Sequence, residues 1–161
     1  MSRKIALITG ASRGLGKSTA LHLAAQGVDI IGTYQSREAD AQATVAEIQA
    51  LGSKAHMLQL DVGQSDSFDG FAKQLGSVLK KVFSAEHFDF LVNNAGVGIY
   101  NSIAQTTEDQ FDQLVNIHFK GPFFLTQKLL PLIADGGRIV NLSSGLARFS
   151  MVGYAAYASM K

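Results

Sequence analysis

Short apolar runs alternate with longer, helix-like segments along this chain of 161 residues. Five apolar runs predict buried strands, at residues 5–9, 28–34, 55–60, 88–93 and 137–142. Helices are expected at residues 17–26, 39–51, 65–83 and 107–133, and a last helix begins near residue 152. Parallel strands need crossover connections, usually helices, so this alternation implies a parallel sheet with helices on both faces. The predicted fold class is therefore α/β, a doubly wound parallel sheet followed here as far as its fifth strand and the start of the next helix.

The composition bounds the kind of protein. Hydrophobic residues make up 47% and charged residues 17% of the chain, which suits one folded domain over residues 1–161. The net charge of +1 gives no electrostatic case for nucleic acid. Cysteine is absent, which excludes disulfides and cysteine metal sites, and we predict no metal site. Because no apolar run approaches the ~18 residues of a membrane span, we expect a cytoplasmic protein without a membrane partner.

A glycine-rich turn follows the first predicted strand. Gly10, Gly14 and Gly16 stand in a G-x-x-x-G-x-G spacing directly between that strand and a predicted helix. Glycines in such a turn let the backbone bend sharply and let a pyrophosphate approach the main-chain amides. The start of the helix adds free N–H groups and a positive dipole end. The turn therefore predicts a nucleotide site of the Rossmann-like kind.

The same turn comes close to a second nucleotide motif. Residues 11–18 fall one residue short of the phosphate-binding loop of NTPases, and Asp61 follows an apolar strand as a magnesium-binding aspartate does. However, Ala11 stands where that loop has glycine, and Gly10 comes one place too early. We keep a P-loop NTPase as a disfavoured alternative, which magnesium-dependent ATP binding would reveal.

A tyrosine and a lysine stand four positions apart at the end of the sequence. On a helix, Tyr157 and Lys161 would share one face. An ammonium beside a phenol stabilises the phenolate, which makes Tyr157 a candidate general acid/base near neutral pH. Tyr154 is an internal comparison, because its partner four residues on is Ala158. Alone, such a pair is more often a surface coincidence, and the rest of the chain must decide its meaning.

Five motifs stand in order along the chain: Thr9-Gly10-x-x-x-Gly14-x-Gly16, Asp61-Val62 after the third strand, Asn93-Asn94-Ala95-Gly96 after the fourth, Ser144, and Tyr157-x-x-x-Lys161. Together they resemble the motifs of the short-chain dehydrogenase/reductase family, over essentially the whole chain. The wording of the glycine turn and of Gly32-Thr33 is similar to that of 3-oxoacyl-[acyl-carrier-protein] reductases. The terminal tyrosine and lysine have no use in an NTPase, so the resemblance argues against that alternative.

The resemblance implies hydride transfer between a nicotinamide cofactor and a carbonyl or secondary alcohol. It implies that Tyr157 is the general acid/base, that Lys161 assists it and binds the nicotinamide ribose, and that Ser144 holds the carbonyl oxygen. Ser143 is the weaker candidate, because neighbouring side chains of a strand point to opposite sides. The expected cofactor-binding residues are Gly10, Ser12, Arg13, Gly14, Leu15, Gly16, Arg37, Asp61, Val62, Asn94, Ala95, Gly96, Tyr157 and Lys161.

One position departs from the family's pattern. The family has a catalytic asparagine in the fourth helix, and counting back from Gly121 and Phe123 leads to His118. Asn116 lies two residues earlier, roughly 200° around a helix. Either His118 takes the position or the helix is locally re-registered. We favour His118, because the resemblance implies that a main-chain carbonyl there holds a water linked to Lys161. A histidine of structural role only is the competing interpretation.

The end of the second strand bears on the choice of nicotinamide cofactor. Folds that prefer NAD place an acid there, ~20 residues beyond the glycines, to bind the ribose 2′-hydroxyl. This chain has no acid at that strand end, and instead has Arg37 after the strand and Arg13 within the glycine turn. Arginines bind a phosphate dianion by charge-assisted, bidentate hydrogen bonds. We therefore expect NADP(H) rather than NAD(H), with a solvated Arg37 as the competing interpretation.

The resemblance further implies a small-molecule carbonyl or alcohol substrate and a homo-oligomer, either a dimer or a tetramer. Members of the family continue beyond this lysine, so we expect the chain to be the N-terminal portion of a longer one, with the fifth strand as an open, apolar edge. Most residues that select the substrate would then lie beyond Lys161. A catalytically silent, NADP-binding regulatory protein on the same fold stays open, and a turnover assay with a panel of carbonyl compounds would decide.

Overall fold

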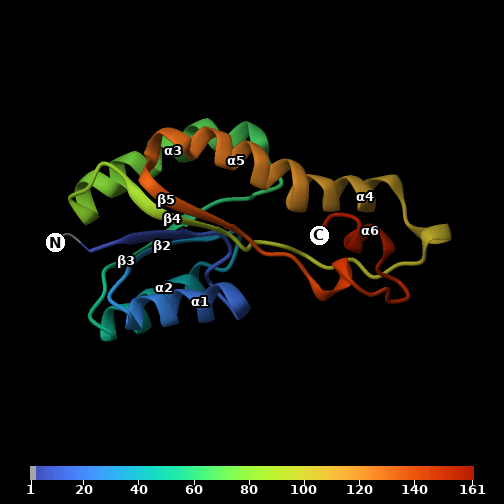
Figure 1. Cartoon of the computed structure of the whole chain (residues 1–161), viewed down its shortest axis with the longest axis horizontal. Helices are drawn as coiled ribbons and strands as arrows, with labels where there is room; N and C mark the ends of the chain where they lie inside the picture. Colours follow the sequence, from blue (N-terminus) through green and yellow to red (C-terminus); the bar gives the residue numbers. More distant parts are fainter. Residues whose placement is uncertain (1–2) are drawn as a thin grey trace.

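A five-stranded, parallel sheet forms the centre of the computed structural model, which describes residues 3–161 (Figure 1). Its strands are β1 (Ile5–Ile8), β2 (Asp29–Tyr34), β3 (Ala55–Gln59), β4 (Phe88–Asn93) and β5 (Ile133–Asn141). They lie in the order β3-β2-β1-β4-β5, so the winding direction reverses between β1 and β4. This order confirms the predicted doubly wound α/β fold and places β5 at one edge of the sheet, as expected.

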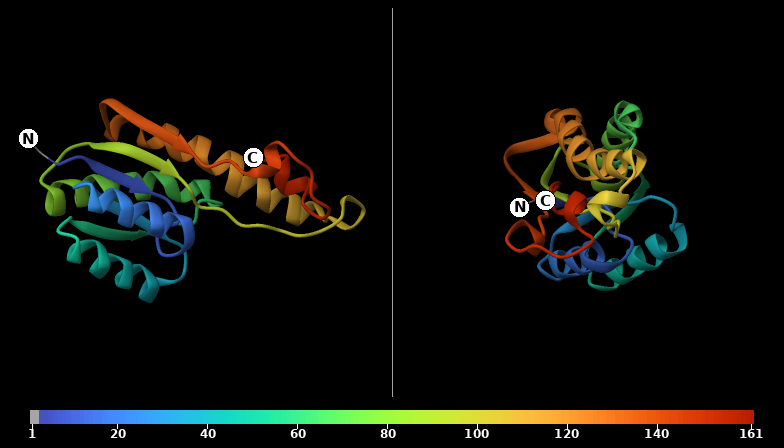
Figure 2. Two further views of the ribbon diagram at one scale, coloured as in Figure 1. Left: turned by 60° about the horizontal axis from the view of Figure 1, so that its bottom comes forward. Right: turned by 90° about the vertical axis from the view of Figure 1, so that its right-hand side faces the viewer.

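Helices cover both faces of this sheet (Figures 1 and 2). One face carries α1 (Gly14–Ala25) and α2 (Glu38–Ala50), and the other carries α3 (Phe68–Val78) and α5 (Gly121–Leu129). Figure 1 shows α4 (Glu108–Val115) continuing the line of α5 past the end of the sheet, with the short α6 (Ala155–Ala158) below it. The first four predicted helices are present, although α1 begins three residues before its predicted start and so includes the last two glycines of the turn. The fourth was expected to reach residue 133, but α5 ends at Leu129 and Ile133 already belongs to β5, whose predicted start was residue 137.

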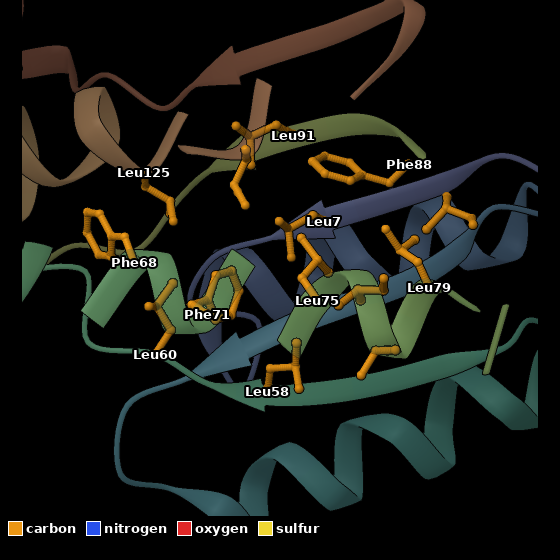
Figure 3. Packing of buried hydrophobic residues seen from close by; sticks show 14 of the residues in the cluster. Leu7, Leu58, Leu60, Phe68, Phe71, Leu75, Leu79, Phe88, Leu91 and Leu125 are labelled. Atoms are coloured by element: carbon orange, nitrogen blue, oxygen red, sulfur yellow. The ribbon is translucent and has the colours of Figure 1, made fainter. Parts of the chain in front are cut away.

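The core forms two layers because alternate residues of a strand face opposite sides of the sheet. On β1, Ile5 and Leu7 belong to the layer that contains Phe68 and Leu75 of the α3 side, whereas Ala6 and Ile8 belong to the layer under α1 and α2. Figure 3 shows the first layer, in which leucine and phenylalanine side chains from strands and helices interlock. Burial of each such side chain stabilises the fold by roughly 1.5–3 kcal/mol. The packing fixes where the strands end, and with them the loops described below.

The interruption expected at Gly121-Pro122 takes the form of a π-helical turn, Asn116–Lys120, between α4 and α5. A capping box of Thr107 and Gln110 begins α4, as predicted. Gly121 permits close contact at the turn, because a Cβ there would overlap the carbonyl oxygen of Val62. Pro122 has no N–H, so the carbonyl of His118 lacks its usual helical donor four residues on.

The last helix is shorter than predicted. It was expected to begin near residue 152 but comprises only Ala155–Ala158. Gly153 has a φ of +83°, and its carbonyl accepts the Asn101 N–H at 2.8 Å, which holds the preceding turn in a non-helical conformation. Beyond α6, the N–H groups of Met160 and Lys161 bond to carbonyls three residues earlier, in a tighter 3₁₀-like turn.

Candidate nucleotide groove and tyrosine–lysine site

A groove of about 360 Å³ opens where the carboxyl ends of the strands meet, at the point where the strand order reverses. The hydroxyl of Thr9, at the end of β1, accepts the N–H groups of Asn94 and Ala95, which follow β4, at 3.0 and 2.9 Å. In addition, Nδ2 of Asn94 donates a hydrogen bond to the Thr9 carbonyl at 2.8 Å. These bonds join the two loops that flank the reversal point, where doubly wound sheets bind their ligands.

The glycine turn forms one wall of this groove. Gly10 adopts a φ of +68°, which favours glycine, and its N–H donates to the Thr33 hydroxyl at 3.1 Å. A Cβ on Gly16 would overlap the Gly10 carbonyl oxygen and lie 2.5 Å from Nδ2 of Asn94, so only glycine fits here. Within residues 3–161, no side chain caps α1 and its first turn carries no acid. The positive end of α1 is therefore available to an anion.

Twelve of the fourteen predicted cofactor-binding residues line the groove. They are Gly10, Ser12, Arg13, Gly14, Leu15, Gly16, Arg37, Asp61, Val62, Asn94, Ala95 and Gly96. The structure thus brings together four segments that are far apart in the sequence: the glycine turn and the ends of β2, β3 and β4. The other two predicted residues, Tyr157 and Lys161, belong to the cluster described below.

Two polar groups of the groove are held in place by side chains that sequence reasoning did not assign to the site. The carboxylate of Asp61 accepts hydrogen bonds from Gln35 Nε2 at 2.9 Å and from the Gly63 N–H at 2.8 Å. Thr33, at the end of β2, holds the glycine turn through Gly10. The available signal was a polar residue at the carboxyl end of a buried strand, where an apolar residue would otherwise be expected. Arg37 is exposed, and its guanidinium lies 3.5 Å from the Asp40 carboxylate.

The ring of Tyr157 lies among three other side chains. His118 and Tyr154 meet it edge to face, with ring centroids 5.2 and 6.0 Å away. The ammonium nitrogen of Lys161 lies 5.7 Å from the centre of the Tyr157 ring and donates to the Leu142 carbonyl at 3.0 Å. Burial lowers the pKa of Lys161 from its ordinary value. Three of the four predicted catalytic residues, Tyr157, Lys161 and His118, therefore form one cluster, although α6 itself ends before Lys161.

The fourth predicted residue, Ser144, lies just beyond β5. Its hydroxyl oxygen accepts the Leu146 N–H at 3.2 Å and begins a short 3₁₀ turn, Gly145–Ala147. The neighbouring Ser143 hydroxyl donates to the Lys161 carbonyl at 2.7 Å. Ser143 and Lys161 also line a second cavity of about 700 Å³, between α5 and β5, together with His118. Ser143 thus supports the segment that carries Lys161, whereas the Ser144 hydroxyl bonds locally.

Two classes of feature are missing from the described residues 3–161. No helix in the described part of the chain is both long and apolar enough to cross a membrane. Among residues 3–161, no group of three or more histidine, cysteine, aspartate or glutamate side chains is arranged to hold a metal ion.

A doubly wound sheet with a glycine-lined groove at its reversal point defines the class of dinucleotide-binding α/β proteins. The sequence model of the family described as short chain dehydrogenase matches residues 4–161. The chain therefore belongs to the short-chain dehydrogenase/reductase family, which confirms the predicted resemblance and removes the NTPase alternative.

Individual relatives agree with this assignment. Hydroxynaphthalene reductase-like protein Arp2 of Metarhizium brunneum is 34% identical over 166 residues, covering 100% of this chain and 58% of the relative. 3-Oxoacyl-[acyl-carrier-protein] reductase FabG of Staphylococcus epidermidis is 35% identical over 160 residues, covering 98% of this chain and 63% of the relative. The structure of the landomycin C-6 ketoreductase LanV with NADP and rabelomycin matches with a TM-score of 0.94 at 34% identity, over 99% of this chain and 65% of that one. The chain thus spans less than two thirds of the length of these relatives.

Proposed function

We propose that this chain supplies the cofactor-binding and proton-transfer parts of an oxidoreductase that moves a hydride between NADP(H) and a carbonyl or secondary alcohol. The observation that carries the proposal is the joining of two sites: the 94–97 loop lines the nucleotide groove and also contacts His118, which packs against Tyr157. A cofactor in the groove would therefore end beside the tyrosine. NADP bound to the ketoreductase LanV supports this choice of cofactor.

The groove has the chemistry that a dinucleotide needs. The glycine turn and the N-terminus of α1 would bind the pyrophosphate. Within residues 3–161, no side chain caps the main-chain amides of this terminus and its first turn contains no acidic residue. Asp61, oriented by Gln35, would bind the adenine end. When bound, the nicotinamide supplies or accepts the hydride. The protein's own task is then to position the carbonyl and to move one proton.

Tyr157 would give its phenol proton to the carbonyl oxygen in reduction and take it back in oxidation. The ammonium of Lys161, 5.7 Å from the centre of the ring, would stabilise the phenolate that remains. The Ser144 oxygen already accepts the Leu146 N–H, so its own proton is free to donate to the carbonyl oxygen. The His118 carbonyl, which cannot receive an N–H from Pro122, would hold the water that resupplies Lys161 with protons.

The proposal includes a homo-oligomer, a dimer or tetramer, as in the family. Large apolar side chains on the α5 side, among them Phe119 and Phe123, are exposed in the single chain and support it. The proposed small-molecule substrate is a carbonyl or alcohol compound. A silent regulatory protein would bind NADPH but turn over no member of a carbonyl panel.

Replacement of the two arginines of the groove tests the choice of cofactor. Loss of a charge-assisted hydrogen bond costs about 1.5–3 kcal/mol. We therefore expect Arg13→Ala and Arg37→Ala each to weaken NADPH binding about ten- to hundredfold, with little change for NADH. Fluorescence titration with both cofactors measures the two dissociation constants. Arg138→Ala, on the β5 edge, is the matched control. An unchanged ratio of NADPH to NADH affinity in both variants would contradict the assignment.

A further inference from the structure

The imidazole of His118 connects the nucleotide groove to the tyrosine cluster. Its Nε2 lies 2.7 Å from the carbonyl oxygen of Val97 and 3.3 Å from the Val97 nitrogen. These two contacts exclude one another, because a nitrogen that carries a proton donates, and one that does not accepts. The shorter contact favours Nε2–H donating to the carbonyl. The other ring nitrogen, Nδ1, then carries only a lone pair.

Nδ1 is buried, and it has no hydrogen-bond partner among residues 3–161. Protonation there would create a buried N–H donor that has no acceptor among the described residues 3–161. The same ring lies against Gly96, where a Cβ would come within 2.6 Å of its Cε1, and meets the Tyr157 ring edge to face. The neutral ring thus fits between the 94–97 loop and Tyr157, whereas the protonated ring would carry a donor there without a partner among residues 3–161.

We propose that His118 is a positioning residue whose neutral ring fastens the 94–97 loop to the tyrosine cluster, and that protonation of its buried Nδ1 weakens this attachment. This inference rests on the proposed function only for its effect on cofactor affinity. It concerns the side chain at a position where the family's pattern has asparagine, and it is separate from the task of the main-chain carbonyl.

The charged and titratable groups around the ring give the direction of the pH dependence. Lys161 and Tyr157 face it from the C-terminal segment, Lys120 lies two residues along its own helix, and the 94–97 loop contributes no titratable side chain. Burial and the charge of Lys161 lower the pKa of His118 below 6.5, while the Val97 bond opposes them. The stability that the packed, neutral ring contributes is therefore fully present above pH 6.5 and falls as the pH drops through the lowered pKa, although the Nε2–H bond to Val97 itself opposes this loss.

Nitrogen NMR of the free protein tests the tautomer directly. Long-range ¹⁵N–¹H correlation spectra identify which ring nitrogen carries the proton and follow its titration. We expect His118 to be the Nε2–H tautomer and to keep it below pH 6.5. The exposed His87 is the internal control in the same spectra. An Nδ1–H tautomer, or protonation of His118 at or above pH 6.5, would overturn the proposal. This measurement needs neither cofactor nor turnover.

Binding measurements on variants test the consequence. His118→Phe keeps a ring against Gly96 and Tyr157 but loses the bond to Val97. We expect it to weaken NADPH binding about five- to tenfold at pH 8. Between pH 8 and 5.5, the affinity for NADPH should fall more steeply in the wild type than in His118→Phe, because only the wild type has the histidine. Titration of the 2′-phosphate is common to both proteins and cancels in the comparison. His87→Asn should follow the wild type.

The two proposals fail in different ways. If the wild type bound no NADPH at any pH, the proposed function would fail, and the NMR experiment would still decide the role of His118. If the wild type bound NADPH and His118→Phe showed the same dissociation constants and the same pH profile, only the positioning role would be wrong. A folded His118→Phe protein is verified by its far-UV circular dichroism.

Discussion

Tyr157→Phe should lower turnover by about 10²–10⁴-fold, the usual contribution of a positioned general acid/base, while NADPH affinity stays close to that of the wild type. The variant keeps the ring that packs against His118 and Tyr154 and removes only the proton that the carbonyl oxygen would receive. Stopped-flow or steady-state oxidation of NADPH with a reactive ketone measures turnover. Fluorescence titration measures binding.

Tyr154→Phe is the matched control for this experiment. Tyr154 also lies in the aromatic cluster, between Tyr100 and Tyr157, and loses the same hydroxyl. Its neighbour four residues on is Ala158, whose side chain cannot stabilise a phenolate as the Lys161 ammonium can. We expect turnover within a few-fold of the wild type. Near-normal turnover in Tyr157→Phe, or an equal loss in both variants, would remove Tyr157 as the proton donor.

Gly16→Ala should have the second large effect, on both folding and nucleotide binding. Its Cβ would overlap the Gly10 carbonyl and crowd the Asn94 side chain, which are main-chain and hydrogen-bonded groups that have little room to move. Forced overpacking of this kind costs about 1–3 kcal/mol of stability. The displaced turn should also weaken NADPH binding by more than about tenfold, since its amides no longer point into the groove. Denaturant unfolding and titration measure the two effects.

Gly70→Ala is the matched control for Gly16→Ala, because it adds the same methyl group but should raise stability instead of lowering it. Gly70 lies in α3, where an added Cβ meets no atom within 4 Å. Alanine there should stabilise the protein by roughly 0.5–1 kcal/mol through its helix propensity, and leave nucleotide binding unchanged. If Gly16→Ala were as stable as the wild type and bound NADPH normally, the close packing of α1 on the glycine turn would not matter for the site.

Local pattern was enough to predict the sheet and the groove. The first four strands contain short apolar runs between turn residues, whereas the start of β5 at Ile133 has no such pattern and was not predicted. The capping box at Thr107 is complete within four residues of sequence. The groove could be predicted because glycines and polar residues follow directly after strands, and parallel strands bring their carboxyl ends to one edge. Even here, the true start of α1 at Gly14 was missed, since glycine's low helix propensity argues against it.

The details that depend on distant contacts could not be predicted. The short α6 results from a hydrogen bond between Asn101 and Gly153, and no local pattern reports such a bond. The hydroxyl of Thr9 reaches residues more than eighty positions away. For His118, the sequence predicted the position in the helix and a use for its carbonyl, but the bond from its ring to Val97 needed the folded structure.

Pro122 has a consequence for what residue 118 is free to be. Proline at position 122 removes the usual i+4 donor to the carbonyl of residue 118, and this effect does not depend on which side chain residue 118 carries. Position 118 can thus satisfy a main-chain requirement and still devote its side chain to another purpose. The two tasks proposed for this position are therefore carried by different groups: the main-chain carbonyl would hold the water, and the imidazole ring contacts Val97.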